Sequence, residues 1–106
     1  MIKRALFFEN QVYLSLKDDQ LLITYPQKDI SPKTVPIEDI GIIVIETLLA
    51  TLTTSLSNKL MENGVGLVIC DARHMPSGLM LPFECHTEQT KRIRTQLDAS
   101  LALKKN

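Results

Sequence analysis

The stretch Gly41-Ile42-Ile43-Val44-Ile45 decides the fold class, because an apolar run without polar alternation is typical of a strand covered on both faces. A second run of this kind, Val65-Gly66-Leu67-Val68-Ile69-Cys70, follows after a segment with helical features. Strand, helix and strand within about thirty residues make a crossover unit, which joins parallel strands of one sheet. The sequence therefore predicts that these two runs lie parallel in the same sheet.

The segment between the two runs has the features of a short helix. Leu56 and Leu60 are four residues apart and share one helical face. Asn63-Gly64 supplies the C-terminal stop, since glycine readily adopts the left-handed conformation that ends many helices. Three threonines can serve as the N-cap, and the sequence leaves the choice between them open: Thr51, Thr53 and Thr54.

The first third of the chain is predicted to consist of strands. Residues 12–16 alternate apolar and polar, the period of a half-buried strand, and residues 21–25 form the next strand, stopped by Pro26. Residues 5–8 precede them, so we expect a meander of consecutive hairpins. Residues 27–33 are predicted to be a surface loop. Residues 34–37 carry a proline and belong at a sheet edge or strand end.

The last third contains a predicted loop, a short extended segment and a helix. Residues 71–78 are polar and contain proline and glycine, and residues 79–83 are predicted to be a short strand or extended tail. Thr87 can cap a final helix that runs toward Leu103. This helix has a narrow apolar stripe: Ile93, Leu97 and Leu101. Such a thin face leads us to expect that the helix packs against something outside the chain.

Composition excludes several classes of protein. The chain has 106 residues, and its 12 Lys and Arg balance its 12 Asp and Glu. This balance argues against a polybasic tail that binds nucleic acid by bulk charge alone, but it allows a local basic patch. No run approaches the roughly 20 apolar residues of a membrane helix, and the apolar segment near the N-terminus is too short for a signal peptide. These features predict a soluble, cytoplasmic protein without a membrane role.

The cysteines and glycines do not form a recognisable catalytic or cofactor motif. A zinc site would need to combine Cys70, His74, Cys85 and His86, whose spacing lacks two close ligand pairs. Cys70 ends an apolar run and is predicted to be a buried small side chain, and no third group supports a Cys–His nucleophile. Gly64-Val65-Gly66 ends a helix and opens a strand, the reverse of a dinucleotide-binding loop.

The order of these segments resembles one known family. Three features carry the resemblance: Pro36-Ile37-Glu38-Asp39-Ile40-Gly41-Ile42-Ile43-Val44-Ile45-Glu46, the threonine-capped helix, and Asn63-Gly64-Val65-Gly66-Leu67-Val68-Ile69-Cys70-Asp71-Ala72-Arg73-His74-Met75-Pro76-Ser77-Gly78. The chain is similar here to the CRISPR-associated integrase, the metal-dependent DNA endonuclease of spacer acquisition and first of the numbered Cas proteins. Residues 1–10 look like the opening of its type II branch, and the similarity continues through residues 85–100.

This resemblance implies an α+β chain cut from a two-domain protein. Residues 1–85 would be the β-rich, sandwich-like N-terminal dimerisation domain with one small helix, including the linker. Residues 86–106 would be the first helix of a truncated all-helical catalytic domain. The family holds its catalytic Mg²⁺ or Mn²⁺ in that helical domain, so the resemblance places no catalytic residue, metal ligand or cofactor in this chain and predicts that the chain alone is inactive.

The resemblance also implies DNA and protein partners. The whole protein would insert foreign DNA into the CRISPR array for antiviral defence, binding prespacer and CRISPR repeat as a homodimer joined to the second numbered Cas protein in a heterohexamer. Lys91, Arg92 and Arg94 are the first candidates for phosphate contacts, and Arg73 and His74 the second. Two alternatives stay open. In the first, the basic residues form a solvated helix face or bind acidic groups of the missing domain, and do not contact DNA. In the second, the chain is a free-standing β-rich protein–protein interaction module with no nucleic-acid role.

Overall fold

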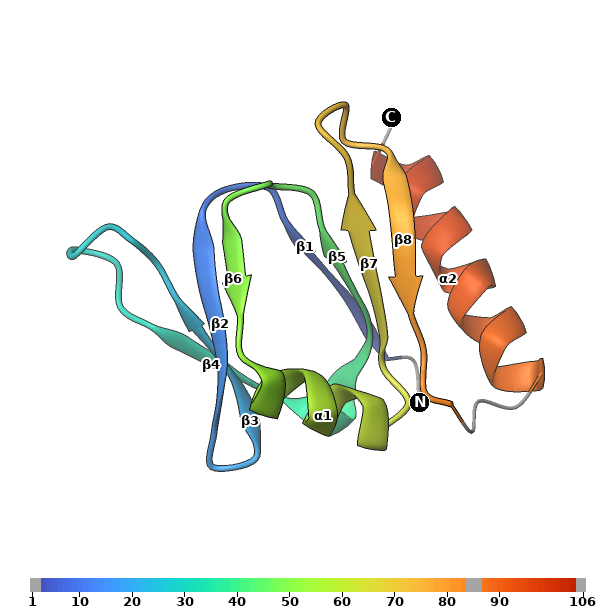
Figure 1. Ribbon diagram of the computed structural model, residues 1–106, viewed down its shortest axis with the longest axis horizontal. Helices are drawn as coiled ribbons and strands as arrows, with labels where there is room; N and C mark the ends of the chain where they lie inside the picture. Colours follow the sequence, from blue (N-terminus) through green and yellow to red (C-terminus); the bar gives the residue numbers. More distant parts are fainter. Residues whose placement is uncertain (1–2, 84–86, 105–106) are drawn as a thin grey trace.

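The computed structural model describes residues 3–83 and 87–104, which form two four-stranded sheets and two α-helices (Figure 1). The first sheet has the strand order β1 (Arg4–Phe8), β5 (Ile40–Ile45), β7 (Gly66–Cys70), β8 (Pro76–Met80). The second sheet has the order β4 (Lys33–Pro36), β3 (Gln20–Thr24), β2 (Val12–Lys17), β6 (Ala50–Leu52). The helices are α1 (Thr54–Glu62) and α2 (Thr87–Lys104), and a short 3-10 turn, η1, spans Ile37–Asp39. The predicted α+β class with a β-rich sandwich is confirmed.

The first sheet is built on the crossover that the sequence predicted. β5 and β7 are parallel, with Ile42 opposite Gly66 and Ile45 opposite Ile69. Every residue of β5 is buried, because the second sheet covers one of its faces and α2 covers the other. The expectation of a parallel, two-sided strand pair is therefore confirmed.

β1 corrects the predicted meander. It does not pair with β2 but lies parallel to β5 in the first sheet, with Ala5 opposite Ile42. Leu6 and Phe8 pack into the core between the sheets, whereas Ala5 and Phe7 pack on the side of α2. Ala5-Leu6-Phe7-Phe8 has no polar alternation, so it fits a strand covered on both faces better than a half-solvated hairpin.

The second sheet follows the alternation in the sequence. Val12 and Leu14 of β2 are buried and Tyr13 between them is exposed, while the antiparallel partner β3 buries Leu21 and Ile23. β4 lies at the edge of this sheet and ends with Pro36, as predicted from the proline. The short strand β6, parallel to β2, was not predicted, since it has three residues without a periodic pattern.

Helix α1 begins and ends where its capping residues indicate. The Thr53 hydroxyl accepts a hydrogen bond from the Leu56 amide at 3.3 Å, which selects Thr53 among the candidate caps. Leu56 and Leu60 are fully buried in the core between the sheets. Gly64 has φ +69°, the left-handed conformation expected after the last turn.

Strand β8 begins earlier than predicted. The polar stretch 71–78 and the expected strand 79–83 are replaced by a tight turn and by β8, which pairs antiparallel with β7. Pro76 is tolerated because β8 is an edge strand. All five residues of β8 are exposed. The strand therefore has no alternation of apolar and polar residues by which the sequence could predict it.

Helix α2 covers the outer face of the first sheet, so that helix, sheet, core and second sheet follow one another in layers (Figure 1). Ile93 is 1% exposed and Leu97 packs beside it against Val68 and Ile42. The expectation that the apolar stripe requires a partner outside the chain is therefore wrong for these two residues. A stripe of only two buried residues is sufficient because the first sheet approaches the helix closely at two of its glycines, Gly41 and Gly66.

Candidate nucleic-acid interface

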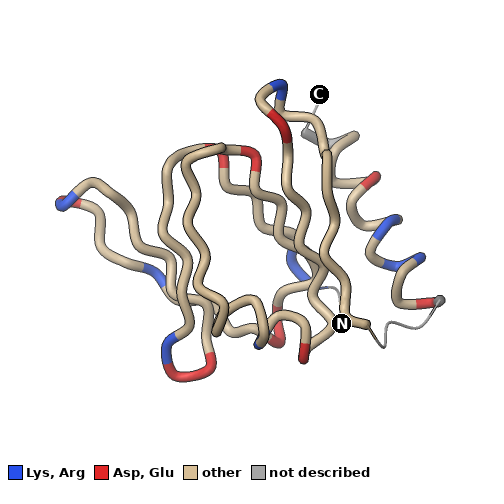
Figure 2. The backbone as a smooth tube through the Cα atoms, viewed as in Figure 1, with Lys and Arg blue, Asp and Glu red and all other residues tan. Residues whose placement is uncertain are grey.

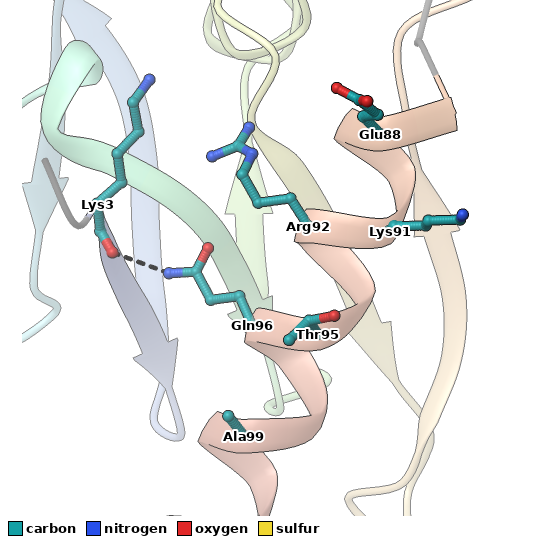
Figure 3. Close-up of a pocket in the computed structure, with 7 residues that line it drawn as sticks. All are labelled: Lys3, Glu88, Lys91, Arg92, Thr95, Gln96 and Ala99. Atoms are coloured by element: carbon teal, nitrogen blue, oxygen red, sulfur yellow. Dashed lines mark hydrogen bonds between the residues drawn. The ribbon is translucent and has the colours of Figure 1, made fainter.

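A groove of about 580 Å³ lies between α2 and the segment that enters β1. Seven residues line it: Lys3, Glu88, Lys91, Arg92, Thr95, Gln96 and Ala99 (Figure 3). Three of them are cations, and none of these has an ion-pair partner in the described part of the chain. Figure 3 shows Lys3 on the strand side, the Arg92 guanidinium between Lys3 and Glu88, and Lys91 pointing away from them. Cations in a concave site concentrate positive potential, which attracts anions.

Gln96 fixes the floor of this groove. Its side-chain Nε2 donates a hydrogen bond to the main-chain carbonyl of Lys3 at 2.9 Å. Its Oε1 lies against Gly41 of β5, so close that a Cβ at position 41 would be 2.5 Å from it. The amide is thus held between strand β5 and the residue that precedes β1, and the helix is attached to the sheet at that point.

Two further glycines give α2 its close approach to the sheet. A Cβ on Gly66 would be 2.7 Å from Ile93 Cγ2, and a Cβ on Gly64 would collide with the Gln89 side chain. Gln89 Nε2 also donates to the Gly64 carbonyl at 2.9 Å. Each of these glycines leaves room for one side chain of the helix, which explains how a narrow apolar stripe is buried.

The structure separates the three basic residues predicted on this helix. They lie in the first half of α2 (Figure 2). Residues two apart on a helix differ by about 200° in direction, so Arg92 and Arg94 point to opposite flanks. Lys91 and Arg92 line the groove, whereas Arg94 lines a different hollow of about 460 Å³ beside β8, next to Asp98.

Arg73 and His74 lie at the exposed turn between β7 and β8. The Asp71 carboxylate organises this turn, since its Oδ1 accepts the amide hydrogens of Arg73 at 2.9 Å and Met75 at 3.1 Å. His74 has φ +63°, a left-handed conformation that places it at the tip. The turn leads into the start of β8, which lines a hollow together with α2 residues between Ile93 and Leu101. The residues that line the groove are different ones, so the turn is separate from it.

The described residues contain no group of three or more His, Cys, Asp and Glu side chains that could hold a metal ion. Cys70 is 2% exposed, as predicted, and burial, together with the nearby Asp71 carboxylate, raises the pKa of its thiol. A raised thiol pKa disfavours the nucleophilic thiolate. Cys85 and His86, considered for the same chemistry, lie outside the described residues.

Sequence reasoning missed Lys3 and Gln96 as parts of this site. Lys3 stands next to Arg4 before the first strand, and nothing in its surroundings links it to a helix 93 positions away. A signal was present in Gly41, which opens a buried strand at a position where a side chain would ordinarily improve packing. An unexplained glycine at the start of a buried strand indicates that another element approaches closely.

Among residues 3–83 and 87–104, no helix has the length and apolar character needed to cross a bilayer.

Comparison with solved structures establishes the fold. A CAS1 protein from Thermotoga maritima superimposes with a TM-score of 0.63 at 14% identity, covering 76% of this chain and 26% of that one. The TtCas1–DNA complex gives 0.65 at 16% identity, covering 77% and 30%. A Cas6-RT-Cas1–Cas2 complex gives 0.69 at 16% identity, covering 85% and 10%. The two-sheet architecture described above is thus shared with these chains.

Comparison of sequences establishes the family. The profile of the family described as CRISPR associated protein Cas1 matches residues 6–106. The CRISPR-associated endonuclease Cas1 of Neisseria meningitidis serogroup C (strain 8013) is 39% identical over 105 residues, a match covering 99% of this chain. The chain spans 34% of the length of that relative. Because the family profile covers almost every residue, the chain belongs to the Cas1 family of CRISPR-associated proteins.

Proposed function

We propose that this chain binds DNA and forms a homodimer as the N-terminal part of a CRISPR spacer-acquisition integrase. The observation that carries the proposal is the groove lined by Lys3, Lys91 and Arg92, none of which has an ion-pair partner in the described chain. Because the net charge of the chain is zero, DNA would be attracted by these local cations and not by the total charge. The proposal draws support from a relative named as an endonuclease and from a similarly folded chain whose structure is a DNA complex.

The groove suits phosphates better than bases. Lysine and arginine contact phosphate oxygens through charge-assisted hydrogen bonds, and such contacts position a protein on DNA without reading its sequence. Among residues 3–83 and 87–104, the side chains that line the groove include no aromatic ring on which a base could stack. We therefore assign Lys91 and Arg92 to the DNA backbone. Arg94, on the other flank, and the turn with Arg73 and His74 form separate secondary contacts.

The chemical step is assigned to residues beyond those described. In the proposed reaction a prespacer 3′-hydroxyl attacks a phosphodiester of the CRISPR repeat, assisted by Mg²⁺ or Mn²⁺. We assign the metal ligands and the reacting groups of this step to the helical catalytic domain of the whole protein. Residues 1–85 would act as the dimerisation domain and residues 86–106 as the opening helix of a catalytic domain. The proposed assembly also includes the second numbered Cas protein, and a similarly folded chain in a Cas6-RT-Cas1–Cas2 complex supports that partner. We propose a heterohexamer as its stoichiometry.

Strand β8 offers a surface for the proposed dimer. It is an edge of the first sheet, and all of its residues are exposed, including Leu79 at 43% and Met80 at 41%. Ile69 on the neighbouring strand is 47% exposed. An open strand edge flanked by apolar side chains pairs readily with another chain, and pairing of two copies closes both edges at once.

DNA binding is tested by fluorescence anisotropy with a labelled forked duplex over a range of salt concentrations. We expect affinity to fall steeply with salt, and the double variant Lys91→Gln with Arg92→Gln to lower the slope by about 0.9 for each lost phosphate contact. Lys28→Gln, in the exposed loop between β3 and β4, is the control with no expected effect. Absence of salt-dependent binding by the wild-type chain would refute the DNA role and favour a protein–protein interaction module.

The dimer surface is tested by sedimentation velocity. A Cβ on Gly78, in the middle of β8, meets no atom within 4 Å, so Gly78→Lys adds a charge at the edge without disturbing the fold. We expect wild type and Gly78→Ala to sediment as dimers and Gly78→Lys as a monomer, because like charges would face each other across the pair. If Gly78→Lys sediments as a dimer, another surface forms the interface.

A further inference from the structure

We infer that Gln96 is a positioning residue that holds Lys3 at the groove, so that Lys3 and Arg92 together bind the phosphates of one DNA backbone. The inference rests on the proposed DNA binding and adds to it a contact residue and the residue that places it. Neither Lys3 nor Gln96 belongs to the basic residues identified on the helix from the sequence.

The first argument is that Gln96 is immobilised at both ends of its amide. Nε2 donates to the Lys3 carbonyl at 2.9 Å, and Oε1 is packed against Gly41. The side chain is partly buried, so this hydrogen bond is shielded from competing water. A glutamine fixed in this manner determines where the main chain of Lys3 lies relative to α2.

The second argument is that Lys3 requires such a fixed point. It precedes β1, whose pairing with β5 starts at Arg4 opposite Ile40 and shifts register immediately afterwards. Residues before the first strand of a domain are poorly ordered unless something ties them down. The hydrogen bond from Gln96 ties Lys3 to the helix that carries Arg92. Ordering Lys3 in advance lowers the entropic cost of using its ammonium group in binding.

The third argument is the complementarity of the two cations. Figure 3 shows Lys3 on the strand wall and Arg92 projecting from the helix toward the same space. A guanidinium binds phosphate oxygens in a bidentate manner and an ammonium group acts as a point charge, so together they suit adjacent phosphates of one backbone. An acidic peptide is the competing ligand for two cations. It lacks the condensed counterion atmosphere of DNA, whose release makes the logarithm of the binding constant fall linearly with the logarithm of the salt concentration.

The test compares salt slopes of DNA binding, measured with the same forked duplex, for variants that move Lys3 without changing formal charge. Gln96→Ala removes the hydrogen bond. Gly41→Ala places a methyl group against the Gln96 oxygen and displaces the flexible end of that side chain from the opposite side. Gln89→Ala is the matched control, because Gln89 makes an equivalent 2.9 Å bond from the same helix to Gly64, outside the groove.

We expect Gln96→Ala and Gly41→Ala each to reduce the slope by up to about 0.9, as Lys3→Gln does, and Gln89→Ala to leave it unchanged. In a Lys3→Gln background, Gln96→Ala should have no further effect, since Gln96 acts through Lys3.

Equal losses of slope from Gln96→Ala and Gln89→Ala, or additive losses when Gln96→Ala is combined with Lys3→Gln, would overturn the inference while leaving DNA binding intact. Loss of salt dependence in the wild-type chain would instead overturn the proposed function and this inference together. If these variants weaken the binding of an acidic peptide but leave DNA binding unchanged, the groove binds a protein partner instead of DNA.

Discussion

The side-chain amide of Gln96 and the main-chain carbonyl of Lys3 are joined by a 2.9 Å hydrogen bond across 93 positions of the sequence. This contact attaches the last described helix to the segment that begins the first strand. It places cations from both ends of the chain on one groove. The same helix approaches the sheet at Gly41, Gly64 and Gly66, so its docking is a property of the β-rich core and not of the helix alone.

Substituting Gly66 is expected to disturb this docking. In Gly66→Ala the new methyl group would lie 2.7 Å from Ile93 Cγ2, which is inside van der Waals contact, and Ile93 is fully buried. Overpacking of this kind costs roughly 1–3 kcal/mol of the free energy of unfolding, measured by urea denaturation. Gly78→Ala is the control, because a Cβ there has open space. Equal stability of the two variants would show that α2 does not rest on β7 in solution.

Ile93→Ala tests whether α2 unfolds together with the sheets. Ile93 belongs to the core on the helix side of the first sheet, with Ile42 and Val44. If the helix is integral to that core, the substitution costs roughly 2–5 kcal/mol and lowers the midpoint of a single cooperative transition. If residues 86–106 instead belong energetically to a separate domain, the midpoint reported by the sheets stays unchanged. The experiment therefore tests the proposed boundary after residue 85.

Within the described part of the chain, Glu88 is the one carboxylate that lines the basic groove. Glu88→Gln removes a negative charge that repels phosphates, so we expect DNA affinity to rise several-fold at low salt and the gain to shrink as salt screens the charges. Asp98→Asn, on the flank of the same helix that faces β8, is the matched control. Should Asp98→Asn strengthen binding as much as Glu88→Gln does, the effect would come from net charge rather than from the groove.

Thr53→Ala tests the identity of the N-cap of α1. The Thr53 hydroxyl accepts the Leu56 amide hydrogen, and its loss is expected to cost about 1 kcal/mol in the free energy of unfolding. Thr54 is exposed and lies inside the helix, so Thr54→Ala should change stability by much less. A larger loss for Thr54→Ala in the same chemical denaturation experiment would contradict the capping assignment.

The raised pKa of the Cys70 thiol predicts a loss of stability in alkaline solution. Burial and, secondarily, the Asp71 carboxylate keep the native thiol protonated where the unfolded thiol has already ionised. The native state then binds more protons than the unfolded state. Stability is therefore unaffected below about pH 8.5 and falls as the pH rises toward the native value. Urea midpoints at neutral and alkaline pH should diverge more for wild type than for Cys70→Ala, and parallel curves would contradict the prediction.

The sequence predicted those parts of the fold that have a clear hydrophobic pattern, either an unbroken apolar run or a strict alternation. The unbroken runs of β5 and β7 and the alternation of β2 led to the correct sheets, because burial on two faces or on one face determines which residues are apolar. β1 was assigned to the wrong sheet, since a short apolar strand fits either partner until the rest of the core is assembled. β6 and β8 are short or fully exposed and so carry no such signal.

The candidate site was predicted only where charge and helical position coincide. Lys91 and Arg92 were identified from their place on the last helix and lie in the groove, whereas Arg94 points to the other flank because of helical geometry. Lys3 was not found, since its place depends on a single hydrogen bond from Gln96. Contacts between distant segments made by individual polar side chains leave no periodic pattern in a sequence.

DNA binding in the groove can be observed residue by residue, by amide chemical-shift mapping of the ¹⁵N-labelled chain during titration with the forked duplex. We expect the signals of Lys3, Arg92 and Gln96 to move together, at DNA concentrations that saturate the anisotropy change, and high salt to reverse the shifts. Shifts confined to the β7–β8 turn or to the outer face of the second sheet, with the groove signals unmoved, would contradict DNA binding in the groove.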